Sequence, residues 1–447
     1  MLRLLIAARV FQSVGGGIPK YVRAVARYAH MRGMQVLALL SAADPFIETD
    51  VPVGVFREPI TDSTGIRPAS IMRKMSFLKK THASVVFIAH AEKVLFLNLA
   101  IAAKLLGIPV VGSHQGMIRT LPPRSSPRRR ILGFARGVGW WWRRIALPRR
   151  ILAECTALAL FNNRSNVPLG VSEIGYTLEQ CCVIHGGVDT ERFRADPLLR
   201  QAARSHLGVG PDRRIVGSIG RFSSDKGQDI LIRAFATSRQ RRLGALLLMM
   251  GAGDQLDSCK RLCRDLELES QVVFLPVRPD VEFIMNALDL FVLPSRSESF
   301  SNSMLEAMAC ARPVVVSAVG GGPDIIVDGK NGLLFKPEDE DALAARIDLA
   351  FESGSGEAMG AAARRTVESG FREDAIMQRT VKAIRNAWGL RAAASPGLSL
   401  LRAWGTAAKI AMSVARDLLS PSFPATCPRS GSRSERRCEV TSARTTH

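Results

Sequence analysis

Two glutamates frame a serine-rich stretch in the second half of the chain, ESFSNSMLE, with Glu298 and Glu306 separated by seven residues. The segment from Ser303 to Glu306 has the pattern of a capping box, in which the serine caps a helix and the glutamate bonds back to the cap amide. Pro313 then ends the predicted helix. A cap explains Glu306 but leaves Glu298 unexplained, and free amides at such a helix start can also hold phosphate or hydroxyl groups.

A pair of cations precedes these carboxylates in the stretch IGRFSSDKGQDILIRAF. Arg221 lies at the end of a predicted strand, and Lys226 lies just before an amphipathic helix. Two cations beside a helix N-terminus can neutralise a diphosphate, although an exposed turn with solvated charges has the same pattern. The following turn, with Gly251 and Gly253 in MMGAGDQ, indicates either a tight turn or close approach of the backbone to a ligand.

Two histidines are candidates for chemistry in the first half, His114 and His90. His114 in GSHQG follows a buried strand, where a histidine is either a hydrogen-bonded structural residue or a substrate-facing one. His90 in IAHAEK has a similar place and is a candidate on the acceptor side. Nothing comparable supports a role for His185. The sequence motif alone does not decide whether His114 is a structural or a substrate-facing residue.

The elements that must position these residues alternate between short apolar runs and amphipathic helices, which is typical of parallel α/β domains. After a restart of this pattern near residue 190, two doubly wound domains are predicted, with a site at the carboxyl ends of the strands in the cleft between them. Strands are predicted at 2–10, 35–41, 84–91, 108–116, 157–163, 180–186, 213–221, 245–253, 271–276, 289–295, 312–318 and 332–337, and helices include 18–33, 229–240, 258–268, 303–311 and 340–353.

Composition and charge point to an anionic partner. The chain has 447 residues, which is enough for two domains, with 47% hydrophobic and 23% charged residues and a net charge of +21. Residues 119–150 hold ten arginines and no acid. A phosphorylated substrate, an anionic membrane or nucleic acid would each suit this charge. Since no nucleic-acid module is recognised, nucleic acid is not expected as a partner.

Two segments fall outside the α/β alternation. Residues 122–150 combine Trp140, Trp141 and Trp142 with neighbouring arginines, as in segments that lie on anionic membranes, although the glycines there also suit a solvated insertion. The tail, 391–447, contains an amphipathic pattern with Trp404 and then a Ser/Arg-rich end that is typical of disorder. An anionic membrane surface is therefore an expected partner.

The cysteines and the N-terminus suggest a location. Eight cysteines match neither a zinc site nor a disulfide framework, so a reducing cytoplasm is expected. MLRLLIAARVF lacks a small-residue cleavage site and is interpreted as a first buried strand rather than a signal peptide. The longest apolar stretch, 94–112, is interrupted by polar residues and Pro109, so no membrane span is predicted. We expect a cytoplasmic protein that can lie peripherally on the inner membrane face.

The order of these motifs resembles glycosyltransferase family 4, also called glycosyl transferases group 1. The resemblance is dense from about Ile215 to Phe335, through GR–FSSDKG, GAG, VVFLPVRPDV, the ESFSNSMLE stretch and VGGGPDIIVDGKNGLLF. It continues more sparsely in the first half, through VGGGIPKYV, AHAEK, GSHQG, GVSE and VIHGGVDTERF. The family implies the two-domain GT-B fold, a nucleotide-diphosphate sugar as donor, a retaining mechanism and no metal or other cofactor.

The resemblance implies a role for each matching residue. Arg221 and Lys226 match the cations on the donor diphosphate, Glu298 the acid at the transferred sugar, and Glu306 the acid at the ribose. The remaining matches are His114 at the donor sugar, Arg278 in the loop 277–279 at the base edge, the amides of Ser301, Asn302 and Ser303 near the diphosphate, the donor-side turn of Gly251 and Gly253, and the backbone-approach loop of Gly15, Gly16 and Gly17.

Some positions depart from the family pattern. Pro276 stands where glycine is frequent, Gly186 where asparagine often precedes GVD, and Ser299 and Ser301 where glycine is often found. None of these changes removes a charged group, so they bear on donor identity rather than on activity. The run Asp339-Glu340-Asp341 is interpreted as an acidic helix start, favourable to the helix dipole, rather than as a metal site.

The combined prediction is a retaining hexosyltransferase or related enzyme acting on a lipid-linked acceptor or in cell-surface polysaccharide or lipopolysaccharide biosynthesis. Fixed cations suit a reaction in which negative charge develops on a departing diphosphate. The alternatives are another GT-B enzyme such as a sugar-nucleotide epimerase, or a non-catalytic relative that binds nucleic acid or membrane. The predicted domains are 1–190, 191–372, a helix at 373–390 that crosses back to the first domain, and the tail.

Overall fold

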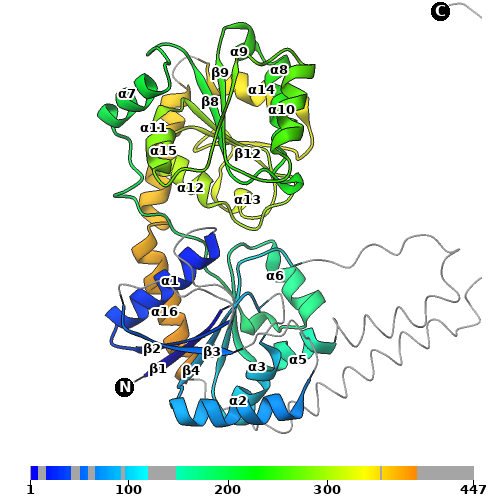
Figure 1. Cartoon of the computed structure of the whole chain (residues 1–447), viewed down its shortest axis with the longest axis vertical. Coiled ribbons are helices and arrows are strands. Elements are labelled where there is room, and N and C mark those ends of the chain that lie inside the picture. The colour runs from blue at the N-terminus through cyan, green and yellow to red at the C-terminus, as the bar shows by residue number, and fades with distance from the viewer. Residues whose placement is uncertain are drawn as a thin grey trace, which may run out of the picture. The chain divides into compact units, whose positions relative to one another are not determined.

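The first parallel sheet has seven strands in the order β3-β2-β1-β4-β5-β6-β7 (Figure 1). In this computed structural model, residues 2–8, 17–41, 51–58, 66–91, 96–118, 147–352 and 355–389 are described. The predictions for Gly15, Gly16, residues 119–146 and the tail lie outside these ranges. The strands are β1 (Arg3–Ala7), β2 (Gln35–Ser41), β3 (Val53–Glu58), β4 (Val85–Ala89), β5 (Val110–His114), β6 (Thr156–Phe161) and β7 (Cys181–Val183).

All six strands predicted in this half are present, and β3 was missed. Pro52 and Gly54 interrupt its apolar pattern, and it pairs only with β2 at the sheet edge, where half-burial suffices. The helices of this domain are α1 (Gly17–Met31), α2 (Pro68–Thr81), α3 (Leu97–Leu105), α5 (Leu147–Cys155) and α6 (Asn166–Leu169), followed by a π-helical turn (Gly170–Ile174) and a 3-10 turn (Leu178–Gln180).

Helix α16 (Glu373–Gly389) completes the core of the first domain although it comes from the end of the described chain. Its apolar residues, among them Ile376 and Val381, pack in one cluster with Leu4 of β1 and Val85 of β4. A parallel bridge between Val188 and Arg372 lies where the chain leaves the first domain and returns to it. The helix thus crosses back to the first sheet, beside α1 (Figure 1).

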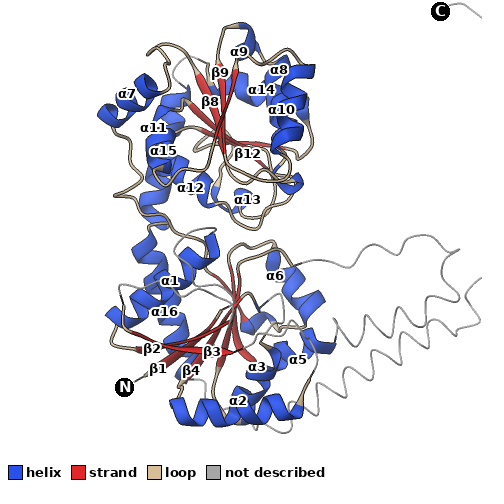
Figure 2. Cartoon of the chain, viewed as in Figure 1, coloured by secondary structure: helices blue, strands red, loops and turns tan. Residues whose placement is uncertain are grey.

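The second parallel sheet has six strands in the order β10-β9-β8-β11-β12-β13 (Figure 2). All six strands predicted here are present: β8 (Ile215–Ile219), β9 (Leu246–Met250), β10 (Val272–Leu275), β11 (Leu290–Leu293), β12 (Val314–Ser317) and β13 (Leu333–Phe335). The helices are α7 (Pro197–His206), α8 (Gln228–Thr237), α9 (Arg239–Arg242), α10 (Leu256–Asp265), α11 (Val281–Ala287), α12 (Asn302–Ala309), α13 (Gly322–Ile325), α14 (Glu340–Ala350) and α15 (Ser355–Gly370).

Strand order reverses in each sheet beside its first strand, between β1 and β4 and between β8 and β11. Connections on the two sides of such a switch point leave the sheet in opposite directions, so a crevice opens at the carboxyl ends of these strands. In the second sheet those ends lead directly into Arg221 after β8 and Glu298 after β11. The topology therefore brings two of the predicted site residues to one crevice.

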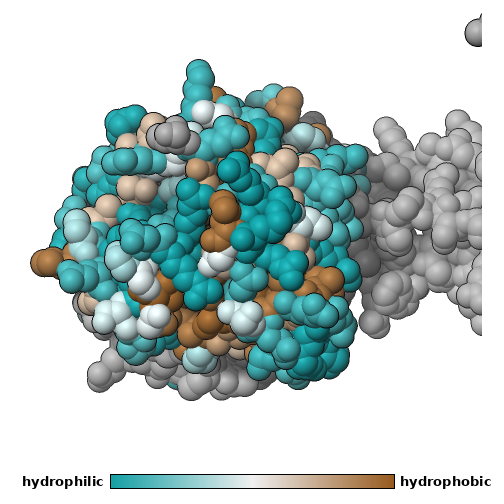
Figure 3. All heavy atoms as spheres, turned by 90° about the horizontal axis from the view of Figure 1, so that it is seen from above, coloured by the Kyte–Doolittle hydropathy of each residue, from teal (hydrophilic) through white to brown (hydrophobic). Residues whose placement is uncertain are grey.

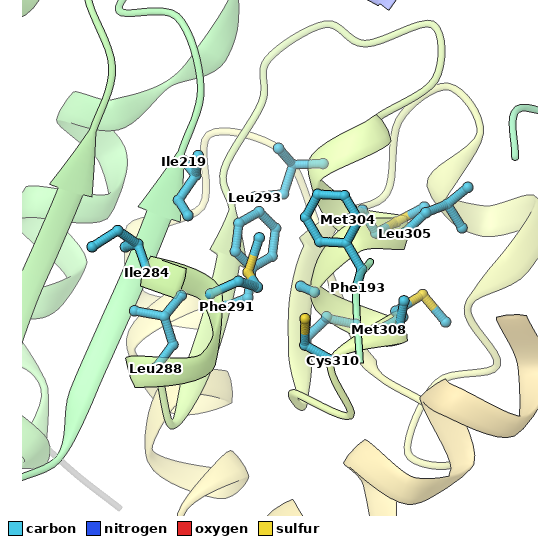
Figure 4. Packing of buried hydrophobic residues seen from close by; sticks show 14 of the residues in the cluster. Phe193, Ile219, Ile284, Leu288, Phe291, Leu293, Met304, Leu305, Met308 and Cys310 are labelled. Carbon is cyan, nitrogen blue, oxygen red and sulfur yellow. The ribbon is translucent and has the colours of Figure 1, made fainter. Parts of the chain in front are cut away.

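The core beneath this crevice anchors helix α12. Met304, Leu305 and Met308 of the helix are fully buried against Phe291 and Leu293 of β11 (Figure 4). Full burial of one such side chain contributes roughly 1.5–3 kcal/mol. The N-terminus of α12 is thus fixed by packing.

The surface is mostly hydrophilic on the face drawn in Figure 3, with small hydrophobic areas between polar residues. Over the described ranges, no helix has the length and apolar content needed to cross a membrane.

Candidate functional site

A cavity of about 760 Å³ lies at the carboxyl ends of both sheets. Residues from the second domain supply most of its charge, and the first domain supplies mainly neutral polar groups, one lysine and one glutamate. We call the first set the second-domain wall: Arg221, Lys226, Glu298, Ser301, Asn302, Ser303 and Glu306. We call the second set the first-domain wall: Gly17, Lys20, Tyr21, Gln115, Asn162 and, from α16, Glu373.

The two predicted cations and the first glutamate meet in this cavity. Lys226, in a 3-10 turn, forms an ion pair with a carboxylate oxygen of Glu298, and both side chains are largely buried. Arg221 is more open: its side chain is 68% exposed and its Nε donates to Ser223 Oγ at 3.2 Å. Lys226 and Glu298 thus neutralise each other, while the largely exposed Arg221 lies 3.6 Å from the Asp225 carboxylate.

The helix N-terminus differs from the sequence prediction in its cap. Ser301, with extended backbone angles, is the N-cap of α12, and its hydroxyl accepts from the amide of Met304 at 3.2 Å. The prediction that Ser303 caps the helix was wrong, because Ser303 is already in the first turn. Glu306, in the second turn, is too far along the helix to complete a capping box. The amides of the first turn, which lack intrahelical acceptors, border the cavity.

Glu306 is a buried carboxyl on the cavity wall. Burial raises its pKa above the ordinary value, and the charges of Lys20 and Arg192 oppose that rise. Lys20 Nζ, from α1 in the first domain, lies 3.9 Å from Glu306 Oε1. Lys20 follows the glycine loop by three positions, but no local pattern links it to an acid 286 residues further along the chain. Sequence reasoning therefore missed it.

His114 does not line the cavity. Its side chain is fully buried, its ring stacks on Phe161 with centroids 4.8 Å apart, and Nε2 lies 3.0 Å from the hydroxyl of Tyr176. This is the structural arrangement that a histidine after a buried strand often has. Gln115, the next residue, lies on the cavity wall instead. The role of His114 at a donor sugar stays a prediction, and contact would require its ring to leave this packing.

Arg278 also lies away from the cavity lining. Its guanidinium forms two hydrogen bonds with Asp280, at 2.9 and 2.7 Å, and lies 5.7 Å from the ring centroid of Phe283. Val281, at the start of α11, is the residue of this region that borders the cavity. The predicted contact of Arg278 with a base edge remains a prediction.

The glycines act in two different ways. A Cβ on Gly17 would lie 2.6 Å from Asn302 Nδ2, so this backbone approaches α12 closely at the cavity. Gly251 and Gly253 are not in the lining: a Cβ on either would overlap the carbonyl oxygen of Gly220 or Phe222. These two glycines let the turn after β9 pack against the loop that carries Arg221.

The acidic run at 339–341 begins α14. Asp339 is the N-cap, and its carboxylate accepts from the amide of Ala342 at 2.9 Å. This confirms the interpretation as a helix start. In the part of the chain that the structure describes, no group of three or more His, Cys, Asp or Glu residues could hold a metal ion.

Two parallel-sheet α/β domains, with cations and acids at the carboxyl ends of their strands, define the class of GT-B proteins. Family models agree: residues 15–192 match Glycosyltransferase Family 4, and residues 200–366 match Glycosyl transferases group 1. The chain belongs to glycosyltransferase family 4.

Curated relatives match part of the chain. It is 40% identical over 181 residues to the D-inositol 3-phosphate glycosyltransferase of Mycobacterium marinum, covering 39% of this chain and 38% of that protein. It is 33% identical over 261 residues to a GDP-mannose-dependent alpha-(1-6)-phosphatidylinositol monomannoside mannosyltransferase of Mycolicibacterium smegmatis, covering 54% of this chain and 66% of that protein. The matched part thus spans less than two thirds of each relative.

Solved structures share the fold at lower identity. HepE from Anabaena, in complex with UDP and glucose, aligns with a TM-score of 0.67 and 22% identity over 86% of this chain and 100% of its own. WaaG, a glycosyltransferase involved in lipopolysaccharide biosynthesis, aligns with a TM-score of 0.64 and 18% identity over 85% of this chain and 99% of its own. These likenesses establish the GT-B fold.

Proposed function

We propose that the protein transfers a sugar from a nucleotide-diphosphate sugar to an acceptor with retention of the anomeric configuration. The observation that carries this proposal is the convergence of Arg221, Lys226, Glu298 and the first turn of α12 on one cavity. Family membership and the names of the curated relatives support it.

The geometry suits departure of a diphosphate. As the bond between the anomeric carbon and the phosphate oxygen breaks, negative charge grows on the diphosphate, and Arg221, Lys226 and the amides of α12 stabilise it. Donor binding would separate Lys226 from Glu298, because the cation then faces phosphate and the carboxylate accepts hydrogen bonds from sugar hydroxyls. The ion pair between Lys226 and Glu298 compensates both charges before the donor binds.

We propose that Glu306 accepts from the ribose hydroxyls of the donor, since it lies on the cavity wall with Lys20 as its charge partner. The reaction we propose takes no metal or other cofactor, because the two cations and the helix amides supply the positive charge at the diphosphate. Unchanged turnover after exhaustive chelation is the expected result.

For the acceptor, we propose a lipid-linked or cell-surface polysaccharide or lipopolysaccharide intermediate at an anionic membrane surface on the cytoplasmic side. The net charge of +21 supports an anionic surface, and one curated relative is named for a phosphatidylinositol mannoside acceptor. Nucleic acid is not part of this proposal.

The test begins with a panel of UDP and GDP sugars screened for thermal stabilisation, because a ligand that binds only the folded state raises the melting temperature. The stabilising donor is then assayed for transfer and for slow hydrolysis, with NMR of the product's anomeric configuration. We expect Glu298→Gln to lower turnover by about 10²-fold or more, within the range for lost transition-state contacts. The matched control Glu368→Gln lies outside the cavity and should turn over as wild type.

Three outcomes would contradict the proposal. Inverted product would remove the retaining mechanism, and recovery of an epimerised sugar nucleotide would favour the epimerase alternative. Wild-type turnover in Glu298→Gln would remove the assigned site.

A further inference from the structure

A buried set of polar side chains joins the two domains beside the cavity. Ser299 Oγ donates to Asn162 Oδ1 at 2.8 Å, and Asn163 Nδ2 donates to the carbonyl oxygen of Ser299 at 2.9 Å. Asn166 Nδ2 is 3.4 Å from the same hydroxyl. We call these four residues the asparagine seam. All four are buried, with Asn163 fully so, and a buried polar group that loses its partner destabilises the fold.

The asparagine seam connects directly to Glu298. The amide of Ser299 donates to Glu298 Oε1 at 3.2 Å, while the other carboxylate oxygen faces Lys226. The carbonyl of Ser299 accepts twice, from Asn163 across the seam and from the amide of Gly321 at 2.9 Å within the second domain. The carbonyl and the amide of Ser299 lie on either side of its Cα, so a shift of Asn163 is passed through this one residue to the amide that bonds to the Glu298 carboxylate.

Ser299 stands at a position where glycine is often found in the family pattern, and a glycine would offer no hydroxyl to the seam. In this chain the hydroxyl is surrounded by three asparagine side chains from the end of β6 and the start of α6. The serine and the asparagines thus form one complementary set.

A second contact between the domains serves as a comparison. The Asp324 carboxylate accepts from the amide of Arg164 at 2.7 Å and lies 3.1 Å from His185 Nε2. The Asp324 side chain lies on α13 and makes no hydrogen bond to Glu298 or Ser299 among the described residues. The backbone of Gly321, the N-cap of α13, does bond to Ser299, so Asp324→Asn changes this contact between the domains without removing that bond.

We propose that Asn163 is a positioning residue for sugar transfer: through Ser299, whose carbonyl it holds and whose amide bonds to Glu298, it sets the carboxylate of Glu298 against the transferred sugar when the two domains are together. The inference rests on the proposed function for its kinetic consequence. The structural basis of the inference is the hydrogen bond from the Asn163 side-chain amide to the Glu298 loop, and this bond does not depend on the proposed function.

The sharpest variant is Asn163→Asp. The retained Oδ1 still accepts from the amide of Asn166 and the hydroxyl of Ser165, both at 2.8 Å, so the local turn into α6 is kept. The lost Nδ2 puts an oxygen against the carbonyl of Ser299, acceptor facing acceptor. We expect kcat to fall about tenfold while the donor KM changes less than threefold, because Glu298 contacts strengthen in the transition state. Ser299→Ala, which removes only the hydroxyl, should lower kcat about threefold.

The pH profile separates positioning from mere stability. A protonated aspartic acid carries an O–H donor that can restore the bond to Ser299, so the ratio of Asn163→Asp to wild-type kcat should rise as the pH falls. The control is Asp324→Asn, which alters the other inter-domain contact and should keep kcat within threefold of wild type. Equal loss in this control, or an Asn163→Asp kcat equal to wild type, would overturn the proposal.

Hydrogen exchange tests the inference without catalysis, and therefore also if the protein shows no transferase activity. Hydrogen exchange of a peptide spanning 297–301 should be faster in Asn163→Asp than in wild type and unchanged in Asp324→Asn. Faster exchange alongside an inactive wild type would support the hold on the loop and reject the transferase. Unchanged exchange would reject the hold itself.

Discussion

The two walls of the cavity differ in how they carry charge. The second-domain wall places its cations and acids on short turns that follow buried strands and at the start of a packed helix. The first-domain wall offers amides, a phenol and one charge of each sign, Lys20 on helix α1 and Glu373 on helix α16. Charges on turns fixed by buried strands suit a group whose charge changes during the reaction, whereas neutral donors and acceptors suit hydroxyls. The difference supports the proposal that the second domain binds the diphosphate.

The largest expected effect comes from removing one cation from each wall, Lys226 or Lys20, in separate variants. Lys226→Ala removes a cation from the site of the departing diphosphate, and we expect kcat/KM to fall by about 10²–10³-fold. Lys20→Ala removes only the partner of Glu306 and should cost about tenfold or less, mainly in KM for the donor. Steady-state kinetics with the donor found by the panel, and exposed Lys336→Ala as control, measure both. A larger loss in Lys20→Ala would reverse the assignment of the walls.

A smaller effect tests whether backbone packing holds the second-domain wall. In Gly251→Ala the added Cβ meets the carbonyl of Gly220, so the loop carrying Arg221 must move. We expect a loss of about 1–3 kcal/mol in the free energy of unfolding, measured by urea denaturation, together with weaker donor binding. Gly244→Ala is a matched control, because this glycine also has a positive φ but nothing lies within 4 Å of its Cβ position. Similar donor affinity in both variants would show that the packing does not place Arg221.

The smallest effect concerns the pH dependence of the Glu306 site. Its pKa is raised in the folded state, so its contribution to stability is present at acid pH and is lost as the pH rises through the folded pKa. Glu306→Gln removes this dependence. The melting temperature of the variant minus that of wild type should therefore increase from acid to neutral pH. Glu352→Gln, an exposed glutamate that is not among the charges acting on Glu306, serves as control. A constant difference across the pH range would contradict the raised pKa.

Strand positions were largely predictable because buried parallel strands are continuous apolar runs, as in VVVS of β12 and LLLMM of β9. Strand β3 escaped because an edge strand with Pro52 and Gly54 has no such run. Helix α2 lies between two predicted strands, where the alternation predicts a helix, but its start has only Pro68 as a signal, with no capping side chain and no acidic residue in the first turn. Local signals thus identified central strands better than peripheral elements.

The site residues also differ in whether a local sequence motif reveals them. Arg221, Lys226 and Glu298 lie in local motifs and meet in the cavity. Lys20 and Asn163 reach their partners across the domains, so no spacing along the chain reveals them. The capping error has another origin: both Ser301 and Ser303 are good cap residues, and only the extended backbone of Ser301 decides between them.

The return of α16 to the first sheet has a consequence for biosynthesis. Its apolar face fills a cluster on β1 and β4, yet it is translated only after the entire second domain. At about 5–20 residues per second, the nascent first sheet waits on the order of ten to forty seconds with one face incomplete. During this interval exposed Leu4 and Val85 are available to chaperones, so the first domain is expected to mature only when the second has already left the ribosome.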